Sequence, residues 1–412
     1  MIGSLSLAIL TLHRPQVAAP IAHPFRVSGD GIIVDLTVNG RKVTCMFDTG
    51  FGGTLVLNSS VNVGPISGTM TLRDFVGELE ASTVKVKSMS VGGLTVPPGD
   101  KTVVSRPGDY SFAYNTHVDG ILGLEPFLDV VTEINFEKKQ LIFHPKTTDI
   151  TKRVPDNKRT FLAKLLPTGG NSLEMAVEVS TGKRLIMALD TGNGFYATTH
   201  KDSLDRVGLW PIDRVPKFMS SSFVASGEVN SWTYRMDQAK IYGVPVDVSY
   251  WDVIDLPSSS ADADGTVGFG FLENFNVILD LNRRRVWLDN FKGTAANDEI
   301  GDVGMSAGFD PNRKRTRVAR VAPESPAALA GIEEGDDVLS VDGQELIEAT
   351  FDRMRTLLRG KVGSKVKLVI SRSGELKRLE LERKSLVNVS PGKERLSTGR
   401  SRRPSSVRSV GR

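Results

Sequence analysis

Phe47-Asp48-Thr49-Gly50 is the stretch that decides the predicted fold, because the chain repeats it as Leu189-Asp190-Thr191-Gly192. Each aspartate follows an apolar run typical of a buried strand and opens a loop that contains glycine. A single Asp-Thr before glycine is usually ordinary turn chemistry, so the repetition is what makes the motif informative.

The surroundings of the two triplets repeat in the same order. Asp119-Gly120-Ile121-Leu122-Gly123 follows the first triplet, and Asp264-Gly265-Thr266-Val267-Gly268 follows the second. A closing pair of strands recurs as well, with EKKQLIF at 137–143 and NRRRVWL at 282–288. Short strands separated by glycine-rich turns, repeated once at this spacing, predict two related β lobes.

Composition narrows the kinds of site that these lobes can carry. The 412 residues are 40% hydrophobic and 24% charged, which is a globular balance with room for several domains. The single cysteine, Cys45, excludes an internal disulfide, and five scattered histidines show no ligand spacing, so we predict no metal site. The net charge of +4 comes from the tail, where residues 386–412 hold seven Lys or Arg and one Glu. We therefore predict a disordered basic tail and no specific nucleic-acid surface.

The N-terminal apolar run at residues 4–12, followed by Ala18-Ala19-Pro20, has the composition of a signal peptide without its cationic first part. It is equally compatible with a truncated signal or an ordinary first strand. Periplasmic or secreted localisation is slightly favoured over cytoplasmic localisation.

Two carboxylates on pseudo-symmetric loops can meet near a two-fold axis, where one proton is shared because both cannot ionise together. The ionised carboxyl group can then take a proton from water while the protonated one polarises a carbonyl group. The paired triplets, each with a downstream apolar-apolar-Gly motif, resemble the aspartic proteases, of the retropepsin-like kind but duplicated in one chain as in the pepsin fold. The resemblance covers about residues 26–292.

This resemblance implies a role for each matching residue. Asp48 and Asp190 would form the catalytic dyad without any cofactor. Thr49 and Thr191 would brace the two loops, which Gly50 and Gly192 would shape. Substrate-covering hairpins would include Asp74, Phe75, Gly77, Ala225 and Gly227.

One position departs from the family pattern. Phe51 and Asn193 follow the triplets where the family usually has Ser, Thr or Ala. Loss of that hydroxyl would raise the apparent pKa values of the dyad and move the working pH towards neutral. The bulk of Phe51 could instead block the cleft, which keeps a catalytically inactive, peptide-binding adaptor open as the alternative function.

The C-terminal part carries a second signature. Residues 321–332, with Pro-Ala-Ala-Leu-Ala-Gly, and the following Gly335–Gly343 resemble a bacterial-type PDZ domain. Such domains bind extended peptides by adding a strand to an open sheet edge beside a helix. The usual Gly-Leu-Gly-Phe string is absent near 301–304, so recognition of a terminal carboxylate is in doubt. The expected peptide-binding residues are Met305, Ala307, Phe309, Phe351 and Met354.

The sequence thus predicts a mainly β, bilobal aspartic protease fold followed by a small α/β PDZ domain. The expected function is an aspartic endopeptidase whose PDZ domain recruits polypeptide substrates or gates their access. The oligomeric state stays open, and a monomer is compatible with the sequence. The expected segments are 1–25, an N-terminal segment; 26–150, lobe 1; 151–159, a linker; 160–293, lobe 2; 294–302, a linker; 303–385, the PDZ domain; and 386–412, the tail.

Overall fold

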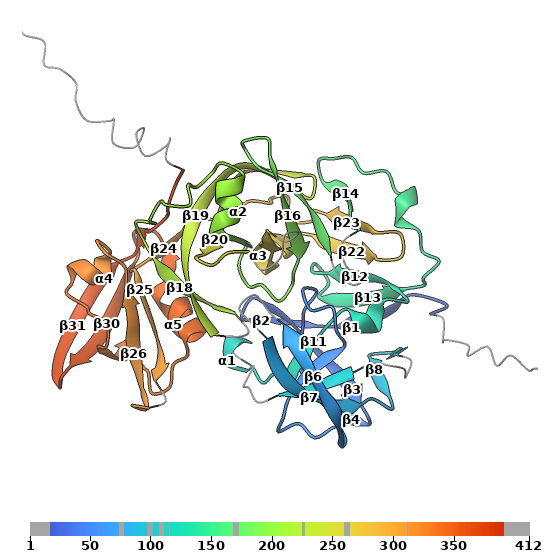
Figure 1. Cartoon of the computed structure of the whole chain (residues 1–412), viewed down its shortest axis with the longest axis horizontal. Coiled ribbons are helices and arrows are strands. Elements are labelled where there is room, and N and C mark those ends of the chain that lie inside the picture. Colours follow the sequence, from blue (N-terminus) through green and yellow to red (C-terminus); the bar gives the residue numbers. More distant parts are fainter. Residues whose placement is uncertain are drawn as a thin grey trace, which may run out of the picture.

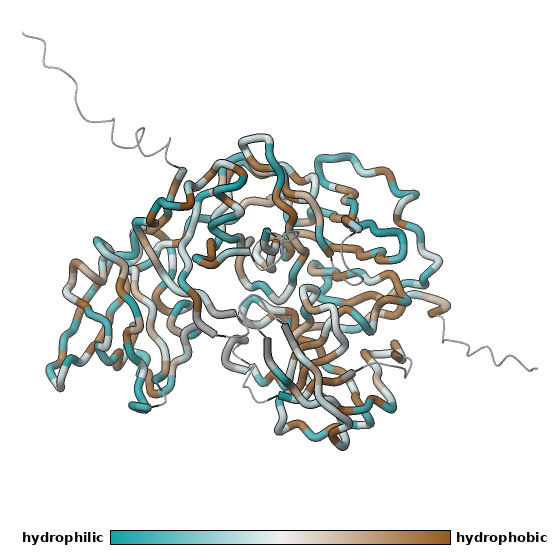
Figure 2. The backbone as a smooth tube through the Cα atoms, in the orientation of Figure 1, coloured by the Kyte–Doolittle hydropathy of each residue, from teal (hydrophilic) through white to brown (hydrophobic). Residues whose placement is uncertain are grey.

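The computed structural model describes residues 17–73, 78–96, 102–106, 111–114, 116–167, 173–224, 227–258, 264–310 and 312–390. The described chain is mainly β. Figure 1 shows two β lobes, blue to teal and green to yellow, with a smaller orange β domain beside the second lobe. Hydrophobic and hydrophilic residues alternate along many of the strands (Figure 2), as expected where one face of a sheet is buried.

Lobe 1 is built around a ten-stranded sheet. Its hairpin from β3 to β4 turns at Asn39 and Gly40, whose φ angles of 49° and 81° suit the tight turn that matches strand twist. Its elements are β2 (Arg26–Ser28), β3 (Gly31–Val38), β4 (Arg41–Phe47), β5 (Leu55–Asn58), β6 (Ile66–Arg73), β7 (Glu78–Lys85), β8 (Met89–Val91), β9 (Leu94–Val96), β10 (Thr102–Arg106), α1 (Ser111–Tyr114), β11 (Gly120–Leu122) and the 3-10 helix η1 (Glu125–Phe127).

Lobe 2 is built around a seven-stranded sheet, which an extra pairing between β15 and β19 closes on itself. Its elements are β15 (Glu174–Glu178), β16 (Arg184–Leu189), β17 (Ala197–His200), α2 (Lys201–Arg206), β18 (Ser220–Val224), β19 (Gly227–Ile241), β20 (Val244–Ile254), β21 (Gly265–Val267) and α3 (Phe269–Leu272).

The same threading of strands occurs in both lobes. β11 runs parallel to β4 and antiparallel to β5, and β21 has the same relation to β16 and β17. This close passage requires glycine, because a Cβ on Gly120 would lie 1.9 Å from the Val56 carbonyl oxygen, and one on Gly265 would lie 2.0 Å from that of Thr198. The repeated Asp-Gly motifs therefore mark the points where a strand is threaded between two others.

A six-stranded sheet joins the lobes, in the order β1-β13-β12-β22-β23-β14. β12 of lobe 1 pairs with β22 of lobe 2, with Thr132 opposite Leu279. One hydrophobic core runs through both lobes, so they form one folded body. The strands and 3-10 helix here are β1 (Ile21–Pro24), β12 (Val131–Asn135), β13 (Gln140–His144), η2 (Ile150–Lys152), β14 (Thr160–Lys164), β22 (Asn276–Asp280) and β23 (Arg285–Asp289).

The C-terminal domain has its own core. A six-stranded sheet includes the order β25-β26-β27-β30-β31, which leaves β25 at one edge, and a small sheet joins β24, β29 and β32. The elements are β24 (Ile300–Asp302), β25 (Met305–Asp310), β26 (Arg315–Val321), α4 (Pro326–Leu329), β27 (Asp337–Val341), β28 (Gln344–Glu345), α5 (Phe351–Leu358), β29 (Gly360–Lys361), β30 (Lys365–Arg372), β31 (Glu375–Glu382) and β32 (Lys384–Ser385).

Three predicted boundaries need correction. β1 lies before residue 26, yet it pairs with β13 in the sheet that joins the lobes. β24 falls in the predicted linker 294–302, yet it pairs with β29 and β32 of the C-terminal domain. Residues 386–390 of the predicted disordered tail pack on lobe 2, where the Asn388 amide N–H donates to the Thr233 carbonyl oxygen over 2.9 Å. Each segment is ordered because its backbone or side chains find partners that the local composition does not reveal.

The described helices are all too short or too polar to cross a bilayer. Within the same residues, no cluster of three His, Cys, Asp or Glu side chains is arranged to hold a metal ion.

Candidate active site

The two Asp-Thr-Gly loops leave their strands at equivalent points and meet between the lobes. The Asp48 amide N–H donates to the Leu122 carbonyl oxygen over 2.9 Å, and the Asp190 amide N–H donates to that of Val267 over 3.0 Å. Each aspartate is thus fixed where a strand ends beside the threaded strand. Asp190 is buried, whereas Asp48 keeps part of its surface exposed.

The two threonines exchange hydrogen bonds across the lobes. The Thr49 amide donates to Thr191 Oγ1 over 3.0 Å, and the Thr191 amide donates to Thr49 Oγ1 over 2.9 Å. Each hydroxyl then donates to the opposite strand, Thr49 to the Leu189 carbonyl oxygen and Thr191 to that of Phe47, at 2.9 and 2.7 Å. All four bonds are buried, so they are shielded from competition by water.

The glycine of each triplet lies against the aspartate of the other lobe. A Cβ on Gly50 would lie 2.6 Å from Asp190 Cγ, and one on Gly192 would lie 2.6 Å from Asp48 Cγ. Any side chain at either position would therefore collide with a carboxyl group. This crossed arrangement brings the carboxyl groups of Asp48 and Asp190 together.

Each carboxylate also accepts two backbone hydrogen bonds within its own loop. Asp48 Oδ1 accepts from the amides of Gly50 and Phe51 over 2.8 and 3.1 Å. Asp190 Oδ1 accepts from those of Gly192 and Asn193 over 2.8 and 3.2 Å. These bonds orient the carboxyl groups and favour their ionised forms.

The electrostatic surroundings of the pair are not symmetric. Burial raises the pKa of Asp48 well above its ordinary value, and the neighbouring charge and hydrogen bond of Asp190 raise it further. Burial also raises the pKa of Asp190, but hydrogen bonds from Asp48, its own loop and the Thr266 side chain oppose that rise. The two carboxyl groups therefore titrate as a pair, and the hydrogen bonds around Asp190 favour its ionised form more than the surroundings of Asp48 do.

The residues after the triplets explain part of this asymmetry. Asn193 Nδ2 donates to the hydroxyl oxygens of Thr266 and Thr198 over 2.8 and 3.0 Å, which leaves the Thr266 hydroxyl hydrogen for Asp190. The sequence pattern pointed to position 193 but not to Thr266, which takes the place of the missing hydroxyl. The signal for it was the contrast between Ile121 and Thr266 in otherwise matching motifs.

Phe51 packs beside the strands of lobe 1. Its ring lies against Gly53 and Gly123, with ring atoms 2.4 and 2.6 Å from the Cβ positions that those glycines lack. It joins the apolar cluster that contains Val56 and Val104. The ring is therefore part of the wall of lobe 1. This position argues against the interpretation that Phe51 blocks the cleft.

The repeated aspartates of the downstream motifs have a bracing position. Asp119 Oδ2 accepts from the Thr44 amide over 2.8 Å, and Asp264 Oδ2 accepts from the Ile186 amide over 2.7 Å. Both carboxylates hold the threaded strand to its parallel neighbour.

The predicted substrate-covering hairpins are only partly described. β6 pairs with β7 up to Arg73 and Glu78, and Asp74, Phe75 and Gly77 at its tip lie outside the described residues. In lobe 2, Gly227 begins β19 opposite Val224, whereas Ala225 lies outside the described residues.

The predicted peptide-binding residues of the C-terminal domain fall into two groups. Met305 and Ala307 on β25 line a groove beside α5. Met354 is a correction, because it is fully buried in the core of the domain, so the groove wall is formed by other residues of the helix and its C-terminal end, Arg355, Leu358 and Arg359. The side chain of Phe351 is outside the described part, and Phe309 follows on β25 beyond the residues that line the groove.

Comparison with known proteins identifies one domain. Residues 317–372 match the family model described as PDZ domain. A probable CtpA-like serine protease of Staphylococcus haemolyticus is 36% identical over 87 residues, 21% of this chain and 18% of that protein. A putative zinc metalloprotease of Brucella suis is 34% identical over 74 residues, 18% of this chain and 19% of that protein. The chain thus spans about a fifth of the length of these relatives.

These matches have the length of a single domain, and the two relatives are named for different catalytic types, so their names do not assign a mechanism to this chain. Among solved structures, the aspartic proteinase from Irpex lacteus aligns with 66% of this chain and 97% of its own, at 15% identity and a TM-score of 0.45. The β25–β31 region, with its own core and the matching family model, is a C-terminal PDZ domain.

Proposed function

We propose that this protein is an aspartic-type endopeptidase in which Asp48 and Asp190 act together. The observation that carries the proposal is the crossed arrangement of the two triplets, in which each glycine lies against the opposite aspartate and each threonine bonds the opposite loop. Such an arrangement holds two carboxyl groups in reach of one water molecule and one carbonyl group.

The asymmetry of the pair supports a different role for each carboxyl group in this proposal. Asp190, as the ionised member, takes a proton from water, whose oxygen attacks the carbonyl carbon of the peptide bond. Asp48 donates its proton to the carbonyl oxygen, which prevents the build-up of negative charge there. Collapse of the tetrahedral intermediate then breaks the C–N bond, as Asp190 passes the proton that it took from water to the leaving amine and Asp48 regains a proton from the hydroxyl group of the intermediate. One water is thus consumed for each bond broken, and the dyad returns to its starting state.

The PDZ domain supports a polypeptide as the substrate class. Its groove between β25 and α5 is suited to an extended chain, and α5 lies next to the active-site loops. The Arg355 guanidinium lies over the Phe195 ring, 4.8 Å from its centroid, and Phe195 follows Asp190 by only five residues. A bound polypeptide would thus be held close to the dyad.

The test is the cleavage of reduced, unfolded casein by the full chain, with and without pepstatin. Asp48→Asn and Asp190→Asn should each lower the cleavage rate by about 10³-fold, in the middle of the range attributed to general acid–base groups. Asp129→Asn is the matched control, because this half-exposed lobe 1 carboxylate pairs with Lys146 away from the dyad.

Cleavage that persists in both dyad variants would overturn the proposal. Casein that is bound but never cut by the unaltered chain would instead favour the peptide-binding adaptor.

A further inference from the structure

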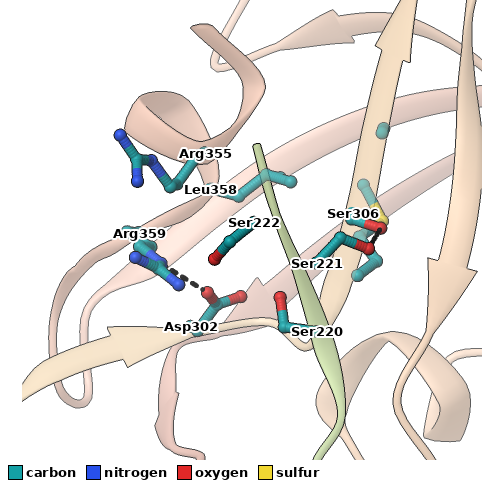
Figure 3. A pocket seen from close by; sticks show the side chains of 10 residues that line it. Ser220, Ser221, Ser222, Asp302, Ser306, Arg355, Leu358 and Arg359 are labelled. Atoms are coloured by element: carbon teal, nitrogen blue, oxygen red, sulfur yellow. Dashed lines mark hydrogen bonds and ion pairs between the residues drawn. The ribbon is translucent and has the colours of Figure 1, made fainter. Parts of the chain in front are cut away.

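The groove of the PDZ domain is already filled by part of lobe 2. Its lining residues come from β25, from Asp302 at the end of β24 and from the C-terminal part of α5 with Arg359, and also from Ser220, Ser221 and Ser222 of β18. Figure 3 shows β18 passing between Arg359 and Asp302 on one side and Ser306 on the other. The space left is about 30 Å³, room for one or two water molecules.

β18 is held in this position by side chains from both domains. Ser221 Oγ lies 3.4 Å from Ser306 Oγ on β25, which is a long contact. On its other face, Ser222 Oγ donates to Asp252 Oδ2 inside lobe 2 over 3.0 Å. β18 therefore reaches across the domain boundary while it stays anchored in its own lobe.

The two facing strands remain in separate sheets. β18 is the edge strand of the lobe 2 sheet, and β25 is the edge strand of the PDZ sheet. An incoming chain that added a full ladder of backbone hydrogen bonds to β25 would gain interactions that the contact between the two serines does not supply. Such a chain could displace β18 from the groove.

The loop at the end of the groove is unsuited to a terminal carboxylate. Asp302 Oδ1 accepts from the Gly304 amide N–H over 2.8 Å, and Asp302 Oδ2 accepts from Arg359 Nε over 3.0 Å. Two donors at this end of the groove, the Gly304 amide and Arg359 Nε, are therefore already bonded to an acidic side chain. A terminal carboxylate would also be repelled by Asp302.

We propose that Ser220–Ser222 occupies the PDZ groove as an intramolecular ligand, and that the groove accepts an internal extended segment of another polypeptide only when β18 is displaced. Asp302 directs the groove to internal segments rather than chain ends. The proposal concerns binding alone and goes beyond the proposed hydrolysis.

The probe is a fluorescent peptide with the sequence of residues 217–224, KFMSSSFV, made both as an amide and as a free acid. Binding is measured by fluorescence anisotropy to the full chain with Asp48→Asn, so that the peptide is not cut. Ser221→Arg should expel β18, because the larger side chain does not fit between β18 and β25, where the hydroxyl oxygens of Ser221 and Ser306 are only 3.4 Å apart. We expect it to bind the amide at least about tenfold more tightly than the parent, since a filled groove lowers apparent affinity by its free fraction.

Ser88→Arg is the matched control, since it adds the same charge at an exposed position of lobe 1 and should bind like the parent. Equal affinity in Ser221→Arg and in the parent would overturn intramolecular occupancy. A free acid that binds tenfold more tightly than the amide would overturn the role of Asp302.

A second pair of substitutions does not depend on how well Ser221→Arg folds. Ser221→Cys with Ser306→Cys should form a disulfide on oxidation, because the two hydroxyl oxygens are 3.4 Å apart and the native Cys45 is buried. The oxidised protein should bind no peptide, and reduction should restore parental binding. Failure to cross-link, or peptide binding that oxidation does not change, would contradict the proposal.

Discussion

The two lobes share a backbone pattern but surround their aspartates with different chemistry. Three equivalent positions around the dyad are apolar in lobe 1 and polar in lobe 2. They are Phe51, Val56 and Ile121 in lobe 1, and Asn193, Thr198 and Thr266 in lobe 2. In lobe 2 the Thr266 side chain lowers the pKa of Asp190 by hydrogen bonding, whereas the apolar side chains of lobe 1 offer Asp48 no such donor. Duplication thus keeps the loop geometry while the side chains make the surroundings of the two carboxyl groups unequal.

The difference extends to the next strand outward. In lobe 1 Val104 pairs with Val56, and in lobe 2 Asp252 pairs with Thr198. Burial raises the pKa of Asp252 to about 6, although hydrogen bonds from Ser222 and Ser231 and the charges of Arg355 and Arg359 oppose the rise. We call Asn193, Thr198, Thr266 and Asp252 the polar layer of lobe 2. This layer ends next to Arg355 and Arg359 of the PDZ domain.

The strongest test of the shared pattern removes one brace at a time. Thr49→Val and Thr191→Val each leave a buried amide N–H and a buried carbonyl oxygen of the other lobe without partners. We expect each to lower the free energy of unfolding by about 4 kcal/mol, since a buried unsatisfied group costs about 1–3 kcal/mol. Urea unfolding measures both.

Thr294→Val, at an exposed position after lobe 2, should change the free energy of unfolding by less than about 0.5 kcal/mol. If one of these two variants lost much less stability than the other, the two loops would not contribute equally. That result would contradict the symmetric hydrogen bonding that the distances indicate.

The polar layer of lobe 2 can be tested through pH. Because the pKa of Asp252 is raised in the folded protein from 3.8 to about 6, the folded state binds the proton more tightly. Its contribution to stability is therefore fully present below pH 4 and is lost as pH rises to 6 and above. Asp252→Asn should reduce the fall in the free energy of unfolding across this pH range by about 3 kcal/mol. Urea unfolding of the variant and of the parent, each at pH 4 and at pH 7.5, measures this difference.

Asp247→Asn changes only an exposed side chain of the same strand, so its pH dependence should match that of the parent. An Asp252→Asn variant with the parental pH dependence would show that Asp252 does not contribute to it.

A smaller effect is expected from the Thr266 hydroxyl group, which has no counterpart at Ile121 in lobe 1. Thr266→Val removes a hydrogen bond that lowers the pKa of Asp190, so less of Asp190 is ionised in acid. The acidic limb of the kcat/KM profile for casein cleavage should move to higher pH, with a severalfold loss of activity at pH 4 and little loss at pH 7.

Thr266→Ser should restore the profile, because it keeps the hydroxyl group. Thr198→Val, which loses a partner of Asn193 only, should shift the profile less. A uniform loss of activity at every pH in Thr266→Val would indicate a change of shape rather than of ionisation.

The sequence predicted the β architecture and the PDZ domain because their signals are periodic or local. Each of these signals is a short run of neighbouring residues, whether it is a triplet, a threaded glycine motif or the PDZ turn. The pairing of β1 and the packing of Asn388 were missed because they depend on partners more than 100 residues away. Composition alone made the segment after residue 385 look like a disordered tail.

The residues of the candidate site were predictable where they belong to a short, repeated motif. Asp48, Asp190 and their neighbours stand in a repeated motif, and the structure brings them together, while their catalytic role stays a prediction. Thr266 differs from Ile121 inside a matching motif, which was a usable signal. The contact of β18 with the PDZ groove had none, because a run of serines does not indicate which surface it faces.

The two asparagines that flank the PDZ domain give it an unusual attachment. Asn297, before the domain, exchanges hydrogen bonds with the backbone of Tyr250, and Asn388, after it, accepts from the amide of Arg235. Tyr250 and Arg235 are paired on neighbouring strands of lobe 2, so the domain enters and leaves at almost one point. Although the domain is C-terminal in the chain, both of its connections are therefore held by one pair of residues in lobe 2, and a change at that pair would act on both ends of the domain at once.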